Sequence, residues 1–166
     1  MTRKIFSRPF TQQEAISQEA IDAATEVLKT GRLHRYNTIE DELSQVSLLE
    51  QEYASYQGSR YCLACTSCGY ALSISLKAAG LESGDYVLTN TYTLAPVPGA
   101  ISNAGGKAIF VEINENLVLD LDDLAQKATS SGARFLLLSH MRGHIVDMNE
   151  LIRIVHEKNL ILIEDC

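Results

Sequence analysis

Positive charge is scarce in this sequence. Its 166 residues include 14 Lys and Arg against 21 Asp and Glu, which gives a formal net charge of -7 and a pI near 5.0. Binding to nucleic acid or to an anionic membrane needs clustered basic side chains that neutralise phosphate. The composition therefore argues against both of these partners and favours small molecules or proteins.

Long apolar runs are also missing. No stretch approaches the length of a membrane span, and the opening "MTRKIFSRPF" has basic residues without the apolar segment of a secretory leader. We therefore expect a cytoplasmic protein without a membrane anchor. The content of 46% hydrophobic and 21% charged residues is that of an ordinary folded domain.

Cysteine is limited to four residues, three of which lie in "CLACTSC" as Cys62, Cys65 and Cys68. This spacing matches the start of an iron–sulfur ligand run, but the sequence continues as "GYALSISLKAAG" and lacks the fourth cysteine that such a run needs. We therefore predict no cluster here, and reduced, buried thiols at Cys62 and Cys65.

His140, His144 and Asp147 form a second group of potential metal ligands in "SHMRGHIVD". They fall in an expected loop between a strand and a helix, and no spacing defines a third or fourth ligand among them. We expect loop architecture here and no metal site.

Helical periodicity alternates with short apolar runs along the chain. One helix is predicted from Thr11, with Glu14 at capping-box spacing, to a stop at Gly31, and a second runs from Val46 to Gly58. Asp147 and Glu150 mark a later helix start. Strands are expected at 60–64, 85–89, 107–113, 134–139 and 160–164.

Apolar strands separated by helices are typical of a mostly parallel sheet that helices cover on both faces. We predict an α/β fold in one continuous unit, with a helical segment over about 1–58 and an α/β core over about 59–166. The aperiodic stretch 31–42 is expected to be a functional or mobile loop.

The segment "CTSCGYALSISL" predicts a turn from a strand into a helix N-terminus. Exposed N–H groups and the helix dipole favour an anion there, and Ser67, Cys68 and Gly69 are small enough to let a phosphate approach the backbone. On these local grounds alone, an ordinary strand-to-helix turn is the first interpretation of the same residues. Neither a Walker pattern nor G-x-G-x-x-G is present.

Several motifs in a fixed order resemble one family. They are small residues before "AL" in "SCGYAL", then "GDYVLTNTYT", then His-x-x-Gly followed by Asp-Met in "SHMRGHIVDM", and then "IED". From about Ile16 to the last residue, the chain resembles the DegT/DnrJ/StrS-type aminotransferases. These are pyridoxal-phosphate enzymes with the aspartate aminotransferase fold, and the match covers part of the large domain of that fold.

The resemblance implies roles for particular residues. Ser67, Cys68 and Gly69 correspond to the loop that holds the cofactor phosphate, Tyr92 to the aromatic residue that stacks on the ring, and Asp165 to the carboxylate that keeps the pyridine nitrogen protonated. Without the resemblance, Tyr92 is packing beside a strand end and Asp165 is a solvated strand-end acid or a helix cap. Glu164 is expected to face the other way.

The sequence departs from the family at two points. Gly69 stands where the family often has Thr, so a hydroxyl contact to phosphate is lost. The match also ends before the family's Schiff-base lysine, and none of Lys77, Lys107, Lys127 and Lys158 has the context of that lysine. The chain alone is therefore expected to be inactive.

Three functions are compatible with these observations. The first is an aminotransferase that moves an amino group from a donor to a keto substrate, plausibly a nucleotide-linked keto-sugar, and that works as a homodimer at full length. The second is a non-catalytic, split or regulatory relative that binds a partner. The third is a related pyridoxal-phosphate lyase or dehydratase that acts on sugars.

Overall fold

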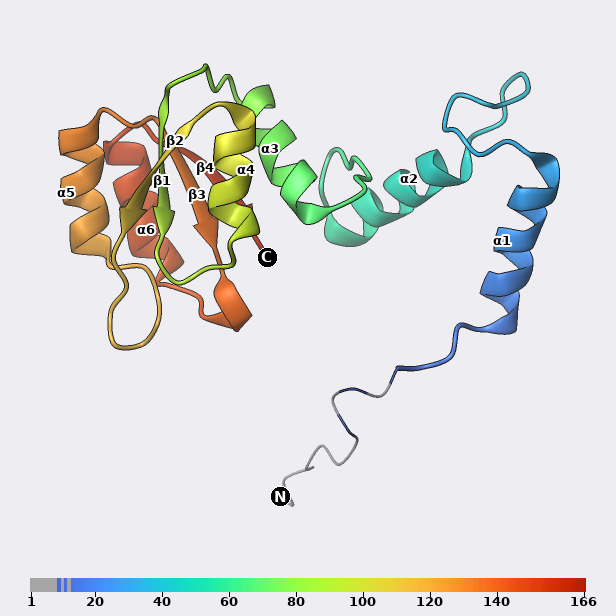
Figure 1. Ribbon diagram of the computed structural model, residues 1–166, viewed down its shortest axis with the longest axis horizontal. Coiled ribbons are helices and arrows are strands. Elements are labelled where there is room, and N and C mark those ends of the chain that lie inside the picture. The colour runs from blue at the N-terminus through green and yellow to red at the C-terminus, as the bar shows by residue number, and fades with distance from the viewer. Residues whose placement is uncertain (1–8, 10, 12) are drawn as a thin grey trace. The chain divides into compact units, whose positions relative to one another are not determined.

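Residues 9, 11 and 13–166 are described by the computed structural model (Figure 1). The opening segment from which we argued against a leader lies almost wholly outside these residues. The chain divides into two units, one up to Ala64 and one from Cys65, and each is described by itself. None of the described helices is long and apolar enough to cross a membrane.

The first unit contains two helices, α1 (Gln18–Thr30) and α2 (Gln45–Gln57). Helix α1 begins later than the capping box at Thr11 predicts, because the Ser17 hydroxyl accepts from the Ala20 amide and caps the helix instead. Its predicted stop is confirmed, since Gly31 adopts a left-handed conformation with φ 68°. Helix α2 ends in the same way at Gly58.

The second unit has four strands, and their order in the sheet is β2-β1-β3-β4 with every pair parallel. Its elements are α3 (Cys68–Ala78), β1 (Tyr86–Asn90), α4 (Pro96–Ala104), β2 (Lys107–Val111), α5 (Leu121–Ser131), β3 (Phe135–Ser139), a short 3-10 helix (Met141–Gly143), α6 (Met148–Glu157) and β4 (Ile161–Asp165). The Asp147 carboxylate caps α6 as predicted.

The strand expected at 60–64 is wrong, because these residues form no ladder in the described structure. A strand depends on partners from distant sequence, and β-propensity alone cannot provide them. The thiols of Cys62 and Cys65 are free, but they are half-buried where we expected burial.

Helices cover both faces of the sheet, as predicted. Figure 1 shows α3 and α4 on one side of the sheet and α5 and α6 on the other. Alternate side chains of each strand enter one of two cores: Val87 and Leu137 pack with α3 and α4, whereas Leu88 and Leu138 pack with α5 and α6. Neighbouring residues at the end of a strand therefore face opposite sides.

Thr89 is a buried polar residue inside β1. Its side chain is fully buried, and its hydroxyl has no hydrogen-bond partner among the described residues. A buried hydroxyl without a partner costs desolvation energy, so we expect Thr89→Val to raise the free energy of unfolding by about 1 kcal/mol. Urea denaturation followed by circular dichroism measures the change, and a clear loss of stability would contradict it.

Candidate functional site

The strands of the second unit all end at one edge of the sheet, because they are parallel. The chain passes from β1 to β2 on one side and from β3 to β4 on the other, so the connections diverge between β1 and β3. In open α/β sheets, ligands bind outside the carboxyl ends of the strands at such a point. Asn90, Ser139 and Asp165 are the last residues of β1, β3 and β4.

The Asp165 carboxylate receives one hydrogen bond on each oxygen. The Ser139 hydroxyl donates to Oδ2 at 2.9 Å, and the Cys68 thiol donates to Oδ1 at 3.3 Å. The pKa of the Cys68 thiol is raised, mainly by this hydrogen bond to Asp165 and to a smaller extent by partial burial and the Asp165 charge. The thiol therefore remains a donor at neutral pH.

Cys68 is also the first residue of helix α3. The Ser67 hydroxyl accepts from the Tyr70 amide at 3.2 Å, and the first intrahelical bond runs from the Ala71 amide to the Ser67 carbonyl. The amides of Cys68 and Gly69 precede that bond, so they point out of the helix end. Of the three residues predicted for an anion site, Ser67 thus caps α3, Cys68 and Gly69 begin it, and Cys68 contacts Asp165.

Space remains next to Gly69. A Cβ atom built there would meet only the Pro96 side chain, at 3.9 Å. Ser67, Gly69 and Lys77 of this region line a cleft together with residues along α4, from Pro96 to Asn103. A small anionic group can therefore approach the helix end without a steric clash.

Tyr92 lies just after β1 and is half-buried. Its ring makes an edge-to-face contact with the His144 ring, with 6.0 Å between the ring centres. The His144 ring in turn forms a hydrogen bond with the Asn116 carbonyl at 3.1 Å. The structure thus places Tyr92 at the carboxyl edge, and its stacking role stays a prediction.

Asn90 and Ser139 were not singled out by the sequence. Asn90 is 3% exposed, and its side chain bonds to the backbone of Ser139 and of Tyr92. A signal does exist in the sequence, because each is the polar residue that ends an apolar strand, in "YVLTN" and "FLLLS". Their contacts join segments about 49 residues apart, which periodicity does not reveal.

Over residues 14–166, the sequence matches the profile of the DegT/DnrJ/EryC1/StrS aminotransferase family. The chain belongs to this family. The resemblance identified from the ordered motifs is thereby confirmed. The cofactor of the family is pyridoxal phosphate.

Similar proteins include two that act on sugars by name. A dTDP-3-amino-3,4,6-trideoxy-alpha-D-glucose transaminase of Micromonospora megalomicea is 28% identical over 148 residues, which cover 89% of this chain and 38% of that protein. A GDP-perosamine synthase of Escherichia coli is 30% identical over 122 residues, which cover 73% of this chain and 33% of that protein.

A solved relative has the same fold. NtdA of Bacillus subtilis, crystallised with bound pyridoxamine phosphate, superimposes with a TM-score of 0.79 at 27% identity and covers 99% of this chain. The match covers 37% of NtdA, so the chain spans less than half the length of these relatives. The predicted α/β fold class is confirmed.

The residues at the carboxyl edge fit the family's cofactor. Exposed amides at the start of α3 suit a phosphate, and the Asp165 carboxylate suits a protonated ring nitrogen. Gly69 offers no hydroxyl, so its contribution to an anion comes from the backbone. The site therefore offers backbone N–H donors for an anion and a carboxylate for a cationic nitrogen.

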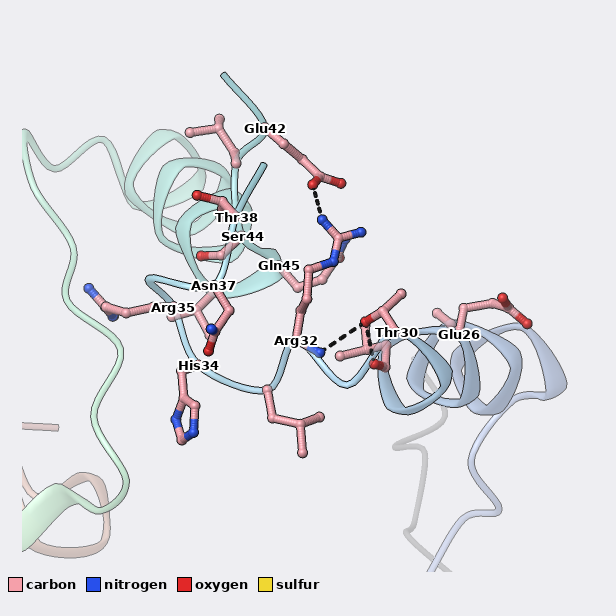
Figure 2. A pocket seen from close by; sticks show the side chains of 15 residues that line it. Glu26, Thr30, Arg32, His34, Arg35, Asn37, Thr38, Glu42, Ser44 and Gln45 are labelled. Carbon is pink, nitrogen blue, oxygen red and sulfur yellow. Dashed lines mark hydrogen bonds and ion pairs between the residues drawn. The ribbon is translucent and has the colours of Figure 1, made fainter. Parts of the chain in front are cut away.

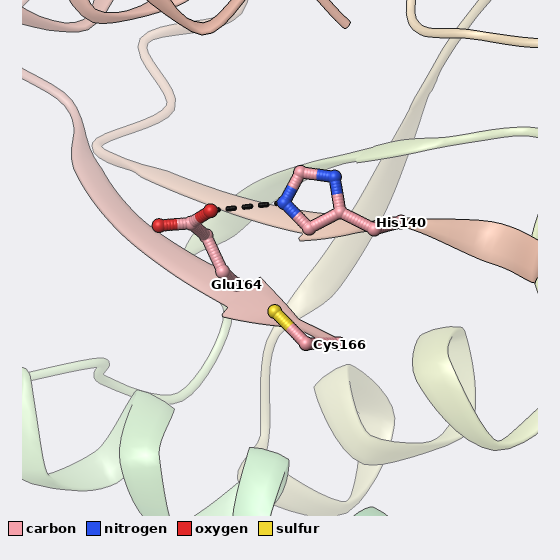
Figure 3. Close-up of side chains that lie close together, drawn as sticks. All are labelled: His140, Glu164 and Cys166. Atoms are coloured by element: carbon pink, nitrogen blue, oxygen red, sulfur yellow. Dashed lines mark hydrogen bonds and ion pairs between the residues drawn. The ribbon is translucent and has the colours of Figure 1, made fainter. Parts of the chain in front are cut away.

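Glu164 faces the opposite side of β4 from Asp165, as predicted. Its carboxylate forms a hydrogen bond with the His140 ring at 2.9 Å, and the Cys166 thiol lies nearby (Figure 3). Ligand atoms of these three residues lie within 4.8 Å of one another. The hydrogen bond between His140 and Glu164 joins the residue that follows β3 to β4. His144, by contrast, contacts Asn116 and Tyr92.

A separate cavity occurs in the first unit (Figure 2). The end of α1, the loop 32–38 and the start of α2 line it, which includes part of the stretch predicted to be a functional loop. Its two arginines are paired: Arg32 with Glu42, and Arg35 with Glu50 at 2.6 Å. Hydrogen bonds from the Ala64 amide and, to a smaller extent, from the Arg35 side chain lower the pKa of the Glu50 carboxyl. These ion pairs leave little net charge on the wall.

Proposed function

We propose that this chain is the N-terminal, cofactor-binding part of a pyridoxal-phosphate-dependent aminotransferase. The reaction would transfer an amino group from an amino donor to a keto-sugar that is linked to a nucleotide. Family membership supports the reaction class, and the two relatives named for dTDP- and GDP-linked sugars support the substrate class. The observation that carries the proposal is the contact between Cys68, at the start of α3, and Asp165.

Each residue of the site has a physical role in this proposal. The Cys68 and Gly69 amides would bind the phosphate, the Tyr92 ring would cover the pyridine ring, and Asp165 would hold the proton on its nitrogen. When bound, pyridoxal phosphate supplies an electron sink for the substrate carbanion. Asp165 is half-buried at the carboxyl end of β4, which strengthens its interaction with a cationic nitrogen.

Among the described contacts, none of the four lysines of the second unit bonds to Asp165 or to the residues that begin α3. Lys107 begins β2, and Lys158 follows α6, so both lie toward the opposite ends of strands. Lys127 bonds to the Phe110 carbonyl and to Asp123. Lys77 follows Cys68 by nine residues, about 14 Å along α3. We therefore propose that the Schiff-base lysine belongs to a longer form of the protein.

The proposed partners follow from the same reasoning. We propose a homodimer for the longer protein, located in the cytoplasm. Helices α1 and α2 bury none of their side chains within their own unit, and large apolar residues such as Leu28, Leu49 and Tyr56 are exposed. Exposed apolar surface of this kind marks sites of interaction.

Binding of pyridoxamine phosphate to the 166-residue chain tests the proposal. We expect Gly69→Asp to weaken binding about tenfold or more, because its carboxylate would repel the phosphate at the helix end. The change should not impair folding, since an acidic residue in the first turn stabilises a helix. Titration calorimetry measures the affinity.

Gly69→Ala is the matched control, because its Cβ has only an ordinary contact with Pro96. It should bind pyridoxamine phosphate within a few-fold of the unchanged chain. Equal affinities of the Asp and Ala variants, or no binding by the unchanged chain, would refute the phosphate site. With an amino donor, the chain should show no turnover.

A further inference from the structure

The pairing between β1 and β3 stops before the strands end. Backbone partners join Val87 with Phe135, Leu88 with Leu136 and Thr89 with Leu137. At the next position, the side chain of Asn90 takes the place of the backbone. Its Oδ1 accepts from the Ser139 amide at 2.9 Å, and its Nδ2 donates to the Ser139 carbonyl at 3.1 Å.

This side chain therefore acts as an additional peptide group between two strands. An asparagine amide has one acceptor oxygen and two donor hydrogens. Ser139 uses the oxygen and one hydrogen, and the Tyr92 carbonyl accepts the other at 2.7 Å. Buried polar networks of this kind hold their members in one arrangement when every group is satisfied.

Ser139 connects this network to Asp165. On one side its backbone is bound by Asn90, and on the other it pairs with β4 in the register Ser139 to Asp165. Its hydroxyl donates to Oδ2 of Asp165, and the side chain is 6% exposed. The opposite oxygen, Oδ1, faces the exposed thiol of Cys68, which is a weak donor.

The two carboxylate oxygens thus have different environments. Oδ2 accepts from the buried hydroxyl of Ser139, and the backbone of Ser139 is hydrogen-bonded to Asn90 on one side and paired with β4 on the other. Oδ1 receives only the weaker hydrogen bond of the thiol among the described contacts of Asp165. A protonated ring nitrogen would displace the thiol more easily than the hydroxyl, because the thiol is the weaker hydrogen-bond donor of the two.

We propose that Asn90 and Ser139 are positioning residues that orient Asp165, with Oδ1 directed to the cofactor and Oδ2 held by Ser139. This role rests on the proposed function of Asp165. It adds Asn90 and Ser139 as residues that act through Asp165. Asn90 would place Tyr92 at the same time, because one side chain bonds to the backbone of both segments. The carboxylate and the aromatic ring would then be fixed by a single buried amide.

The reactivity of the Cys68 thiol reports the position of Asp165 without any cofactor. The thiolate is the form that reacts with iodoacetamide, and the contact with Asp165 disfavours it. If Asp165 leaves its position, Cys68 should react faster near neutral pH. Peptide mass spectrometry of the alkylated 166-residue chain, over a range of pH, gives the rate for each cysteine.

We expect Ser139→Ala and Asn90→Leu to raise the rate of Cys68 alkylation at pH 7 by roughly 3- to 10-fold, toward the rate of Asp165→Asn. Ser139→Thr keeps the hydroxyl and should restore the original pH profile. Thr89→Val is the matched control, since it changes the buried neighbour of Asn90 without touching the network. Cys65 in the same samples monitors general loosening of the fold.

An unchanged or slower Cys68 rate in Ser139→Ala and Asn90→Leu would overturn the positioning role. So would equal acceleration of Cys65, which would show that the variants only loosen the structure. The readout needs no bound cofactor, so the result is independent of the binding experiment with the Gly69 variants. The positioning role and the phosphate site can therefore fail separately.

Discussion

Asp165→Asn is expected to slow transamination by roughly 30- to several-thousand-fold in a longer protein that joins this chain to a Schiff-base lysine. The substitution keeps the shape of the side chain but removes the charge that holds a proton on the pyridine nitrogen. Loss of one charge-assisted, partly buried partner costs on the order of 2–5 kcal/mol, which converts to that range of rates. Single-turnover reaction with an amino donor at saturating cofactor measures the effect.

Glu164→Gln is the matched control for this prediction. Glu164 is the neighbouring carboxylate on β4, but it faces the other side of the sheet and contacts His140. Its loss should change the same rate by less than about tenfold, because it does not approach the ring nitrogen. A normal rate in Asp165→Asn would show that Asp165 is not the partner of the pyridine.

Phe135→Ala should destabilise the second unit by about 3–5 kcal/mol. Phe135 begins β3, a central strand that pairs with both β1 and β4, and its side chain is fully buried between the sheet and the helices α3 and α4. Removing it leaves a cavity that the surrounding strands cannot close, and the cost given is typical of such a change. Urea denaturation followed by circular dichroism measures the shift.

Phe110 provides the comparison. It lies on β2, at the edge of the sheet, and it is 45% exposed. Phe110→Ala should cost about 1 kcal/mol or less, because little buried area is lost and water can fill the space. Similar losses for both variants would mean that β3 is not the centre of this core.

Much of the fold was predictable from local sequence. Four of the six described helices, α1, α2, α3 and α6, and four of the five expected strands occupy regions that periodicity or capping signals indicated. The apolar run of β3 predicts a strand buried on both faces, and all five of its residues are buried. Helix ends at Gly31 and Gly58 were also correct, since a left-handed residue there is a local property of the chain.

The errors share a physical cause. The predicted strand at 60–64 has the right composition, but no distant segment pairs with it in the described structure. The spacing of Thr11 and Glu14 fits a capping box, but in the structure Ser17 caps α1 and the helix begins at Gln18. In both cases a local preference competes with other possibilities, and the sequence pattern does not contain the energies that decide between them.

The sequence by itself determined the α/β class, the helix start at Ser67 and the family, because short-range periodicity and ordered motifs contain that information. Only the tertiary structure showed that Cys68 and Asp165 touch, that Ser139 donates to the same carboxylate, and that Asn90 joins β1 to β3. These contacts link residues 26 to 97 positions apart. They form because parallel strands bring their carboxyl ends to one edge, and the order of the strands decides which residues meet there.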